Sequence, residues 1–200
     1  LYAITFGEPD GNAHPYVGTL LIEQVDGFYS CTGTLLNSTL MLTAGHCLEA
    51  GGRLNLNTWA SFAPAISFPP LGSVAALRAY LDNPANGWIK AAQVIPHPEF
   101  DDYAQFPRSF DVGLVRLAAP ATHTAVFGAL PSEGFLEGIA RKRNQRDNRF
   151  TAVGYGMQGV IRPFYQDTWA RYRGNVKLAE ISSFFNGGQS AKFLNNPGQN

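Results

Sequence analysis

The chain has 200 residues, and its 15 basic and 15 acidic side chains leave no net charge. This balance argues against binding to nucleic acid or to an anionic membrane surface, and no apolar run reaches the roughly 18 residues of a membrane-spanning helix. The abundant glycine, proline, phenylalanine and tyrosine favour short strands joined by turns over a helical bundle. We therefore expect an all-β protein, long enough to bury a substantial core.

The first half of the chain predicts several strands and one ambiguous segment. Residues 14–25, 28–36 and 40–44 are apolar runs bounded by turn residues, which is typical of strands. Residues 71–82 have helix-compatible spacing, although ordinary surface structure explains them equally well. Residues 93–95 predict another strand, and an exposed loop follows it.

The second half opens with a strand at 110–117 that is apolar on both faces and carries Asp111 near its start. Residues 118–124 are poor in charge and contain a proline, so we place a connector between two domains there. The elements predicted beyond it are a helical turn at 134–143 and strands at 150–155 and 174–181, the first of these ended by glycines. The basic run 141–149 is interpreted as a solvated loop, with a processing or polyanion site as the alternative.

The only two cysteines, Cys31 and Cys47, bracket the hairpin predicted from 28–36 and 40–44. The hairpin can bring them together, which favours a disulfide over two unrelated buried thiols. A bridge closing about 15 residues contributes about 3 kcal/mol in the chain-entropy account. A disulfide implies an oxidising compartment, so we expect a secreted protein, extracellular or periplasmic.

The end of this hairpin, Thr43-Ala44-Gly45-His46-Cys47, resembles the histidine loop of the chymotrypsin/trypsin-like serine peptidases. The run Phe110-Asp111-Val112-Gly113-Leu114-Val115-Arg116-Leu117 resembles the family's aspartate strand. The run Ala152-Val153-Gly154-Tyr155-Gly156 is similar to the strand that opens its second barrel. The resemblance implies an all-β fold of two six-stranded antiparallel Greek-key barrels. Residues 1–117 would form the first barrel, 118–124 the connector, and 125–200 a second barrel lacking its C-terminal strands.

Two residues stand where the family's catalytic machinery is expected. Histidine is the usual general base near neutral pH, and the resemblance gives this role to His46. An imidazole base needs a carboxylate that fixes its tautomer, and the resemblance gives that role to Asp111. The alternatives are a structural histidine and an ordinary acid at the start of a strand.

The other histidines carry weaker signals. His14, His97 and His123 lie in turn or connector contexts, and none stands at metal-ligand spacing with a second cysteine or an acid. We therefore expect no metal and no cofactor. A thiol hydrolase using Cys47 with His46 is disfavoured, because adjacent residues on an extended segment point to opposite sides.

The nucleophile of the family is missing from these 200 residues. No Gly-Asp-Ser-Gly-Gly-Pro motif occurs; Ser190 lacks its glycines and its acid, and Ser182 and Ser183 have no motif context. The tail 195–200 resembles the loop ahead of that motif in secreted, bacterial-type members. The resemblance therefore implies a serine beyond Asn200 or on a separate piece, and a chain that is inactive alone.

Two functions follow from this pattern. The first is a serine endopeptidase that hydrolyses peptide bonds through an acyl-enzyme, with protein or peptide as substrate. The alternative is a non-catalytic relative that keeps the scaffold as a binding module. In either case an incomplete barrel would expose unpaired strand edges, so its own C-terminal fragment or a complementing chain is an expected partner.

Overall fold

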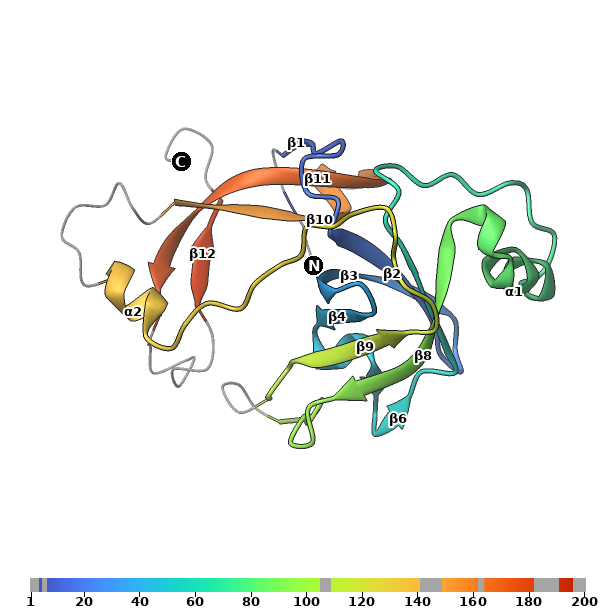
Figure 1. The fold of residues 1–200 in the computed structure, drawn as a ribbon, viewed down its shortest axis with the longest axis horizontal. Coiled ribbons are helices and arrows are strands. Elements are labelled where there is room, and N and C mark those ends of the chain that lie inside the picture. The colour runs from blue at the N-terminus through green and yellow to red at the C-terminus, as the bar shows by residue number, and fades with distance from the viewer. Residues whose placement is uncertain are drawn as a thin grey trace.

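The computed structural model describes residues 4, 7–104, 109–140, 149–161, 164–181 and 191–195, and these residues form a mostly β fold (Figure 1). Six strands close into an antiparallel barrel in the order β2-β3-β4-β9-β8-β7. Their bounds are β2 Val17–Glu23, β3 Phe28–Asn37, β4 Leu40–Thr43, β7 Asn57–Ser61, β8 Trp88–Pro96 and β9 Gly113–Leu117. The expected first barrel is confirmed.

A separate four-stranded sheet lies beside this barrel, and its long strands β10 and β11 pass above it in Figure 1. The sheet contains β1 Glu8–Pro9, β10 Arg149–Ile161, β11 Phe164–Glu180 and β12 Lys192–Leu194. Strand β11 pairs with the other three. The remaining elements are the hairpin β5 Glu49–Ala50 and β6 Arg53–Leu54, the helices α1 Val74–Asp82 and α2 Phe135–Ala140, and the 3-10 helices η1 Gly45–Cys47 and η2 Pro84–Asn86.

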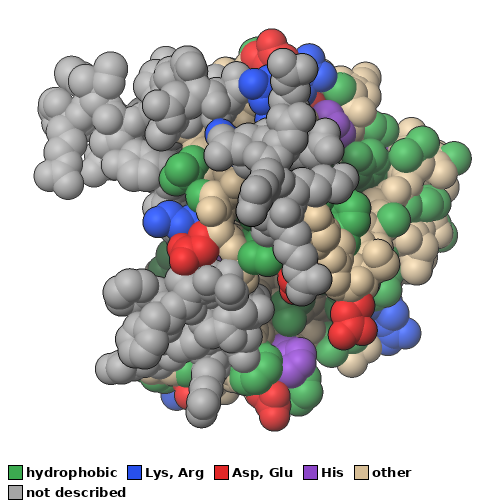
Figure 2. All heavy atoms as spheres, turned by 90° about the vertical axis from the view of Figure 1, so that its left-hand side faces the viewer, with side chains coloured by type: hydrophobic (Ala, Val, Ile, Leu, Met, Phe, Trp, Pro, Cys, Tyr) green, Lys and Arg blue, Asp and Glu red, His purple; other side chains and the backbone are tan. Residues whose placement is uncertain are grey.

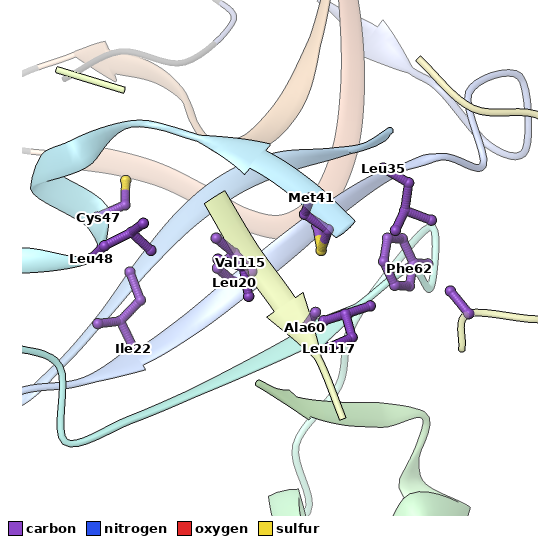
Figure 3. Packing of buried hydrophobic residues seen from close by; sticks show 11 residues of the cluster. Leu20, Ile22, Leu35, Met41, Cys47, Leu48, Ala60, Phe62, Val115 and Leu117 are labelled. Atoms are coloured by element: carbon purple, nitrogen blue, oxygen red, sulfur yellow. The ribbon is translucent and has the colours of Figure 1, made fainter. Parts of the chain in front are cut away.

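The barrel is filled by apolar side chains from all around it (Figure 3), including Leu20, Leu35, Met41, Val115 and Leu117. Strand β2 is buried along its whole length, on both of its faces. Its second face belongs to another cluster, in which Leu21 packs with Trp59, Leu81 and Trp88 under helix α1. Burial on both faces explains why apolar and polar residues do not alternate along this strand, whose two polar members, Thr19 and Glu23, are buried as well.

Helix α1 is capped at its N-terminus and fixed to the barrel by a polar contact near its middle. Ser73 caps its N-terminus by accepting a hydrogen bond from the Ala76 amide. Near its middle, Arg78 pairs with the buried Glu23, and hydrogen bonds from Arg78 and then Asn57 hold the pKa of Glu23 below its ordinary value. The segment 71–82 is therefore helical from residue 74, which settles the ambiguity in its sequence.

The sheet is attached to the barrel through Arg171, whose side chain on β11 is fully buried. Its guanidinium donates to Asp10 Oδ2 at 2.9 Å and to the Val17 carbonyl of β2 at 2.8 Å. Further acceptors are the carbonyls of Gly11 and Phe62 and the hydroxyl of Tyr155. Burial raises the pKa of Tyr155 to about 12, so its hydroxyl stays neutral and also donates to the Ala63 carbonyl.

Two predicted strand limits are wrong in informative ways. Strand β10 continues through Gly156, where φ is +135° and the pairing with β11 shifts, so this glycine produces a bulge where an end was predicted. Strand β9 begins at Gly113 and not at 110, because residues 110–112 form a tight turn. The other predicted strands and the helical turn at 134–143 are confirmed with shifted ends. Most of the basic run, 141–148, lies outside the described residues.

One face of the molecule agrees with the neutral composition. Figure 2 shows acidic, basic and apolar side chains interspersed among the coloured residues of the face that carries α2. Among the described residues, no helix has the length and apolar character needed to cross a membrane. The division of the chain at 118–124 and the missing strands of a second barrel stay predictions.

Candidate active site

The barrel register brings His46 and Asp111 together. Strand β4 pairs antiparallel with β9, and Thr43 at the end of β4 lies opposite Gly113 at the start of β9. His46, which follows β4, and Asp111, which precedes β9, therefore lie at the same rim of the barrel. Residues 65 positions apart in sequence become neighbours through this pairing.

Asp111 holds His46 by two contacts from the two oxygens of one carboxylate. Oδ1 accepts the His46 backbone N–H at 2.8 Å, and Oδ2 lies 2.8 Å from Nδ1 of the ring. A carboxylate acceptor requires a proton on Nδ1, which leaves a lone pair on Nε2. The arrangement can thus present Nε2 as a proton acceptor while the nearby charge stabilises the imidazolium. The two side chains are 44% and 37% exposed, so the pair lies at the surface of the described structure.

An unusual backbone turn aims Asp111 at the histidine. Phe110 has φ +45°, in the left-handed region that non-glycine residues seldom enter and that costs about 1–2 kcal/mol. The Val112 amide donates back to the Phe110 carbonyl at 2.7 Å, and the Phe110 ring stacks on His97 with centroids 5.1 Å apart. The stacked ring and the following strand hold the strained turn. Strain of this kind is common at functional sites.

Two glycines allow the close packing behind the pair. A Cβ on Gly113 would lie 2.5 Å from Leu48 Cδ1, and a Cβ on Gly45 would lie 2.7 Å from the Phe100 ring. Leu48 directly follows the 3-10 turn η1 that carries His46. Small residues at both places therefore let the two segments carrying His46 and Asp111 approach one another.

The turn carrying His46 is fixed on its other side by the disulfide and by a side chain that the sequence did not reveal. Cys31 on β3 and Cys47 on η1 are bonded, with their Cα atoms 6.1 Å apart, as predicted. Asn55 donates from Nδ2 to the Cys47 carbonyl at 2.8 Å, and its backbone amide donates to the Leu48 carbonyl. No motif pointed to Asn55, because its role depends on a contact made only in the folded chain.

The donor atoms of Cys31, His46 and Cys47 lie within 4.8 Å of one another. Metal-binding cysteines act as thiolates, and both sulfurs are here used in the disulfide. This cluster therefore does not fit a metal while the bridge is intact. The bridge also removes Cys47 as a thiol nucleophile.

Of the other histidines, His97 stacks on Phe110 beside Asp111, whereas His14 and His123 make contacts elsewhere. His14 bonds to Asp10, with Nδ1 2.6 Å from Oδ1. His123 stacks on Phe62 and contacts the Pro15 carbonyl through Nε2. The serines considered as nucleophiles, Ser182, Ser183 and Ser190, lie outside the described residues.

The closed antiparallel barrel, the His–Asp pair on its rim and the adjacent disulfide are features of a chymotrypsin-like fold. The chain belongs to the trypsin family, because the family model for Trypsin matches residues 4–159.

Similarity to individual proteins is more limited. The chain is 33% identical over 101 residues to phenoloxidase-activating enzyme 1 of Spodoptera litura, a match that covers 48% of this chain and 25% of that protein. The chain thus spans about a quarter of the length of this curated relative. Among solved structures, it is similar to GrC, with a TM-score of 0.60, 19% identity, and coverage of 89% of this chain and 66% of that one. It is also similar to HL collagenase, with a TM-score of 0.59, 18% identity, and coverage of 89% and 64%. At these identities the two structures support the fold alone.

Proposed function

We propose that this chain is part of a serine endopeptidase in which His46 is the general base and Asp111 orients it. The observation that carries the proposal is the double contact of one carboxylate with the His46 amide and ring Nδ1. His14 makes the same two contacts with Asp10, but that carboxylate is buried and bound to Arg171, whereas the His46 ring lines an open groove that a substrate can enter. Membership of the trypsin family supports the reaction class.

In the proposed reaction, Nε2 of His46 takes the proton from a serine hydroxyl as that oxygen bonds to the carbonyl carbon of the substrate. The imidazolium then gives this proton to the leaving amine, and the C–N bond breaks. Water, deprotonated by the same nitrogen, hydrolyses the acyl-enzyme. Asp111 stays ionised throughout, because its task is to stabilise the charged ring.

The nucleophile belongs, in this proposal, to a segment beyond Asn200 or to a separate piece. The sequence 1–200 contains no Gly-Asp-Ser-Gly-Gly-Pro motif. The chain also spans about two thirds of the similar solved structures. Without that segment we expect no turnover. The Cys31–Cys47 disulfide supports secretion to an oxidising compartment as part of the same proposal.

The alternative, a non-catalytic relative that binds without cleaving, is favoured by one observation, the missing serine motif. The two functions differ in what the complete gene product does with a serine-directed phosphonate. The endopeptidase reacts with it covalently and releases amine from peptide substrates, whereas the binding module does neither.

The test uses the protein expressed from the full reading frame. We expect phosphonate labelling, and a loss of peptide hydrolysis by at least about a thousandfold in His46→Ala and Asp111→Asn near neutral pH. His123→Gln is the matched control, because this histidine contacts Phe62 and Pro15 away from the pair. A complete gene product that lacks the serine motif and resists labelling would rule out the endopeptidase.

A further inference from the structure

An open groove of about 1050 Å³ begins at His46 and the Cys31–Cys47 disulfide and extends along the outside of β3. Its far wall is built from the segment between β7 and β8, through Phe68, Leu71 and Leu77. The groove is thus continuous with the candidate active site. A polypeptide held at His46 would extend into it.

The described residues that line the groove include no Asp, Glu, Lys or Arg. This matters because 15% of the chain is charged and the groove is open to solvent. The exposed part of the far wall is also poor in charge, since residues 62–81 contain Arg78 as their only charged residue, and Arg78 is paired with Glu23. A charged side chain in this groove would lose hydration without gaining a partner. The lining therefore favours apolar occupants.

The far wall is preformed. Phe68 is stacked on Trp88 with ring centroids 5.9 Å apart and meets the edge of Trp169 at 5.5 Å. The loop is further tied to β11, where the Ile66 amide donates to the Trp169 carbonyl at 2.9 Å. Because these contacts already hold the wall in place, an occupant would not have to order it.

The opposite wall presents an unpaired strand edge. Thr43 Oγ1 donates to the Thr32 carbonyl, so the backbone polar groups of Thr32 point away from β2 and toward β4. Backbone groups alternate along a strand, and those of Ser30 therefore point the same way. Strand β4 pairs with β3 only from Thr34 onward, and no described strand faces the outer edge at the exposed Ser30. Such an edge accepts an extended polypeptide better than a compact small molecule.

We propose that this groove binds an extended, uncharged segment of the polypeptide substrate and seats a large aliphatic or aromatic side chain against Phe68, Leu71 and Leu77. The inference rests on the proposed function for the identity of its ligand as a substrate. It assigns a preference at a distance from the scissile bond, set by the segment 62–81.

The test measures binding, which needs no nucleophile and can be read whether or not the chain cleaves peptides. Two fluorescein-labelled octapeptides of equal charge are titrated against the protein expressed from the full reading frame and carrying Asp111→Asn, which suppresses cleavage; one peptide has a Leu-Phe-Val-Leu centre and the other has serine at those positions. We expect the apolar peptide to bind at least about tenfold more tightly, as burial of one large side chain implies. Leu71→Asp should weaken its binding by about tenfold. N-methylation at alternate backbone positions should abolish the preference.

The matched control is Val74→Asp, on the same segment but outside the groove lining. It should change the affinity less than about twofold, since surface charges act weakly at physiological salt. Equal binding of the two peptides, or equal binding by Leu71→Asp and the unaltered chain, would overturn the proposal. Two further results would also overturn the proposal. One is a groove that binds a small apolar dye but neither peptide, and the other is self-association of the chain that Leu71→Asp abolishes.

Discussion

Arg171→Met is expected to be among the most destabilising single changes in the described part of the chain. The guanidinium and the Asp10 carboxylate are both completely buried, and Arg171 donates to five acceptors from three separate segments. Methionine retains the apolar stem but leaves the charge of Asp10 without this partner and removes a donor from several carbonyls. Breaking a buried ion pair by removing one member costs about 3–5 kcal/mol, a large share of an ordinary stability of about 5–15 kcal/mol.

The measurement is urea unfolding near neutral pH, followed by tryptophan fluorescence and repeated by circular dichroism. Arg173→Met is the matched control, because Arg173 lies two residues along the same strand and pairs with Glu8 at the surface. A surface pair contributes at most about 1 kcal/mol. In an Asp10→Asn background, the cost of Arg171→Met should fall by at least about 1 kcal/mol, because the pair is already broken.

Two results would refute the reasoning. A cost below about 1 kcal/mol for Arg171→Met would mean that the buried contacts contribute no more than a surface pair does. A cost for Arg173→Met equal to that of Arg171→Met would mean that β11 tolerates neither change for reasons unrelated to burial.

Three further predictions concern the same framework. Replacing both Cys31 and Cys47 by serine should lower the free energy of unfolding by about 3 kcal/mol, since the bridge spans 16 positions; an unchanged urea midpoint would contradict this. Gly113→Ala should cost about 2 kcal/mol through overpacking, whereas Gly138→Ala in helix α2, with open space around it, should stabilise by about 0.5 kcal/mol. Burial alone would raise the pKa of Asp10, but hydrogen bonds from histidine and arginine outweigh it and hold that pKa below 3.8. The ionised carboxylate therefore stabilises the fold above about pH 4 and loses this effect as the pH falls further. Asp10→Asn should flatten the loss of stability below about pH 4, measured in acid titrations monitored by fluorescence.

Features of the molecule that depend on local sequence patterns, or on a family motif, could be predicted from the sequence. The hairpin closed by Cys31 and Cys47 could be predicted because turn residues separate two apolar runs. The closeness of His46 and Asp111 came from the family resemblance, and the register of β4 with β9 supplies its physical basis.

What the sequence could not predict depends on contacts made only after folding. Gly156 looks like the end of a strand, yet the long partner strand β11 carries β10 past it as a bulge. Residues 71–82 are ambiguous by periodicity, and the capping by Ser73 with the Arg78–Glu23 pair determines the helix. The left-handed turn at Phe110 has no sequence signal, because its ring contact with His97 is a tertiary one.

The candidate catalytic pair is assembled almost entirely within the closed barrel. Residues 31–113 supply all of its parts: His46, Asp111, the disulfide, and the Asn55 side chain that donates to the Cys47 carbonyl. The sheet of β10–β12 contacts this region at Thr32, whose Oγ1 accepts the Tyr155 amide at 2.9 Å, and along the segment 62–66. Because a closed barrel satisfies its own strand edges and both contacts between His46 and Asp111 lie within residues 46–111, the orientation of the base does not depend on the sheet of β10–β12. In the proposed endopeptidase, the barrel therefore prepares the base and its orienting carboxylate, and the segment that brings the serine has only to be positioned against them.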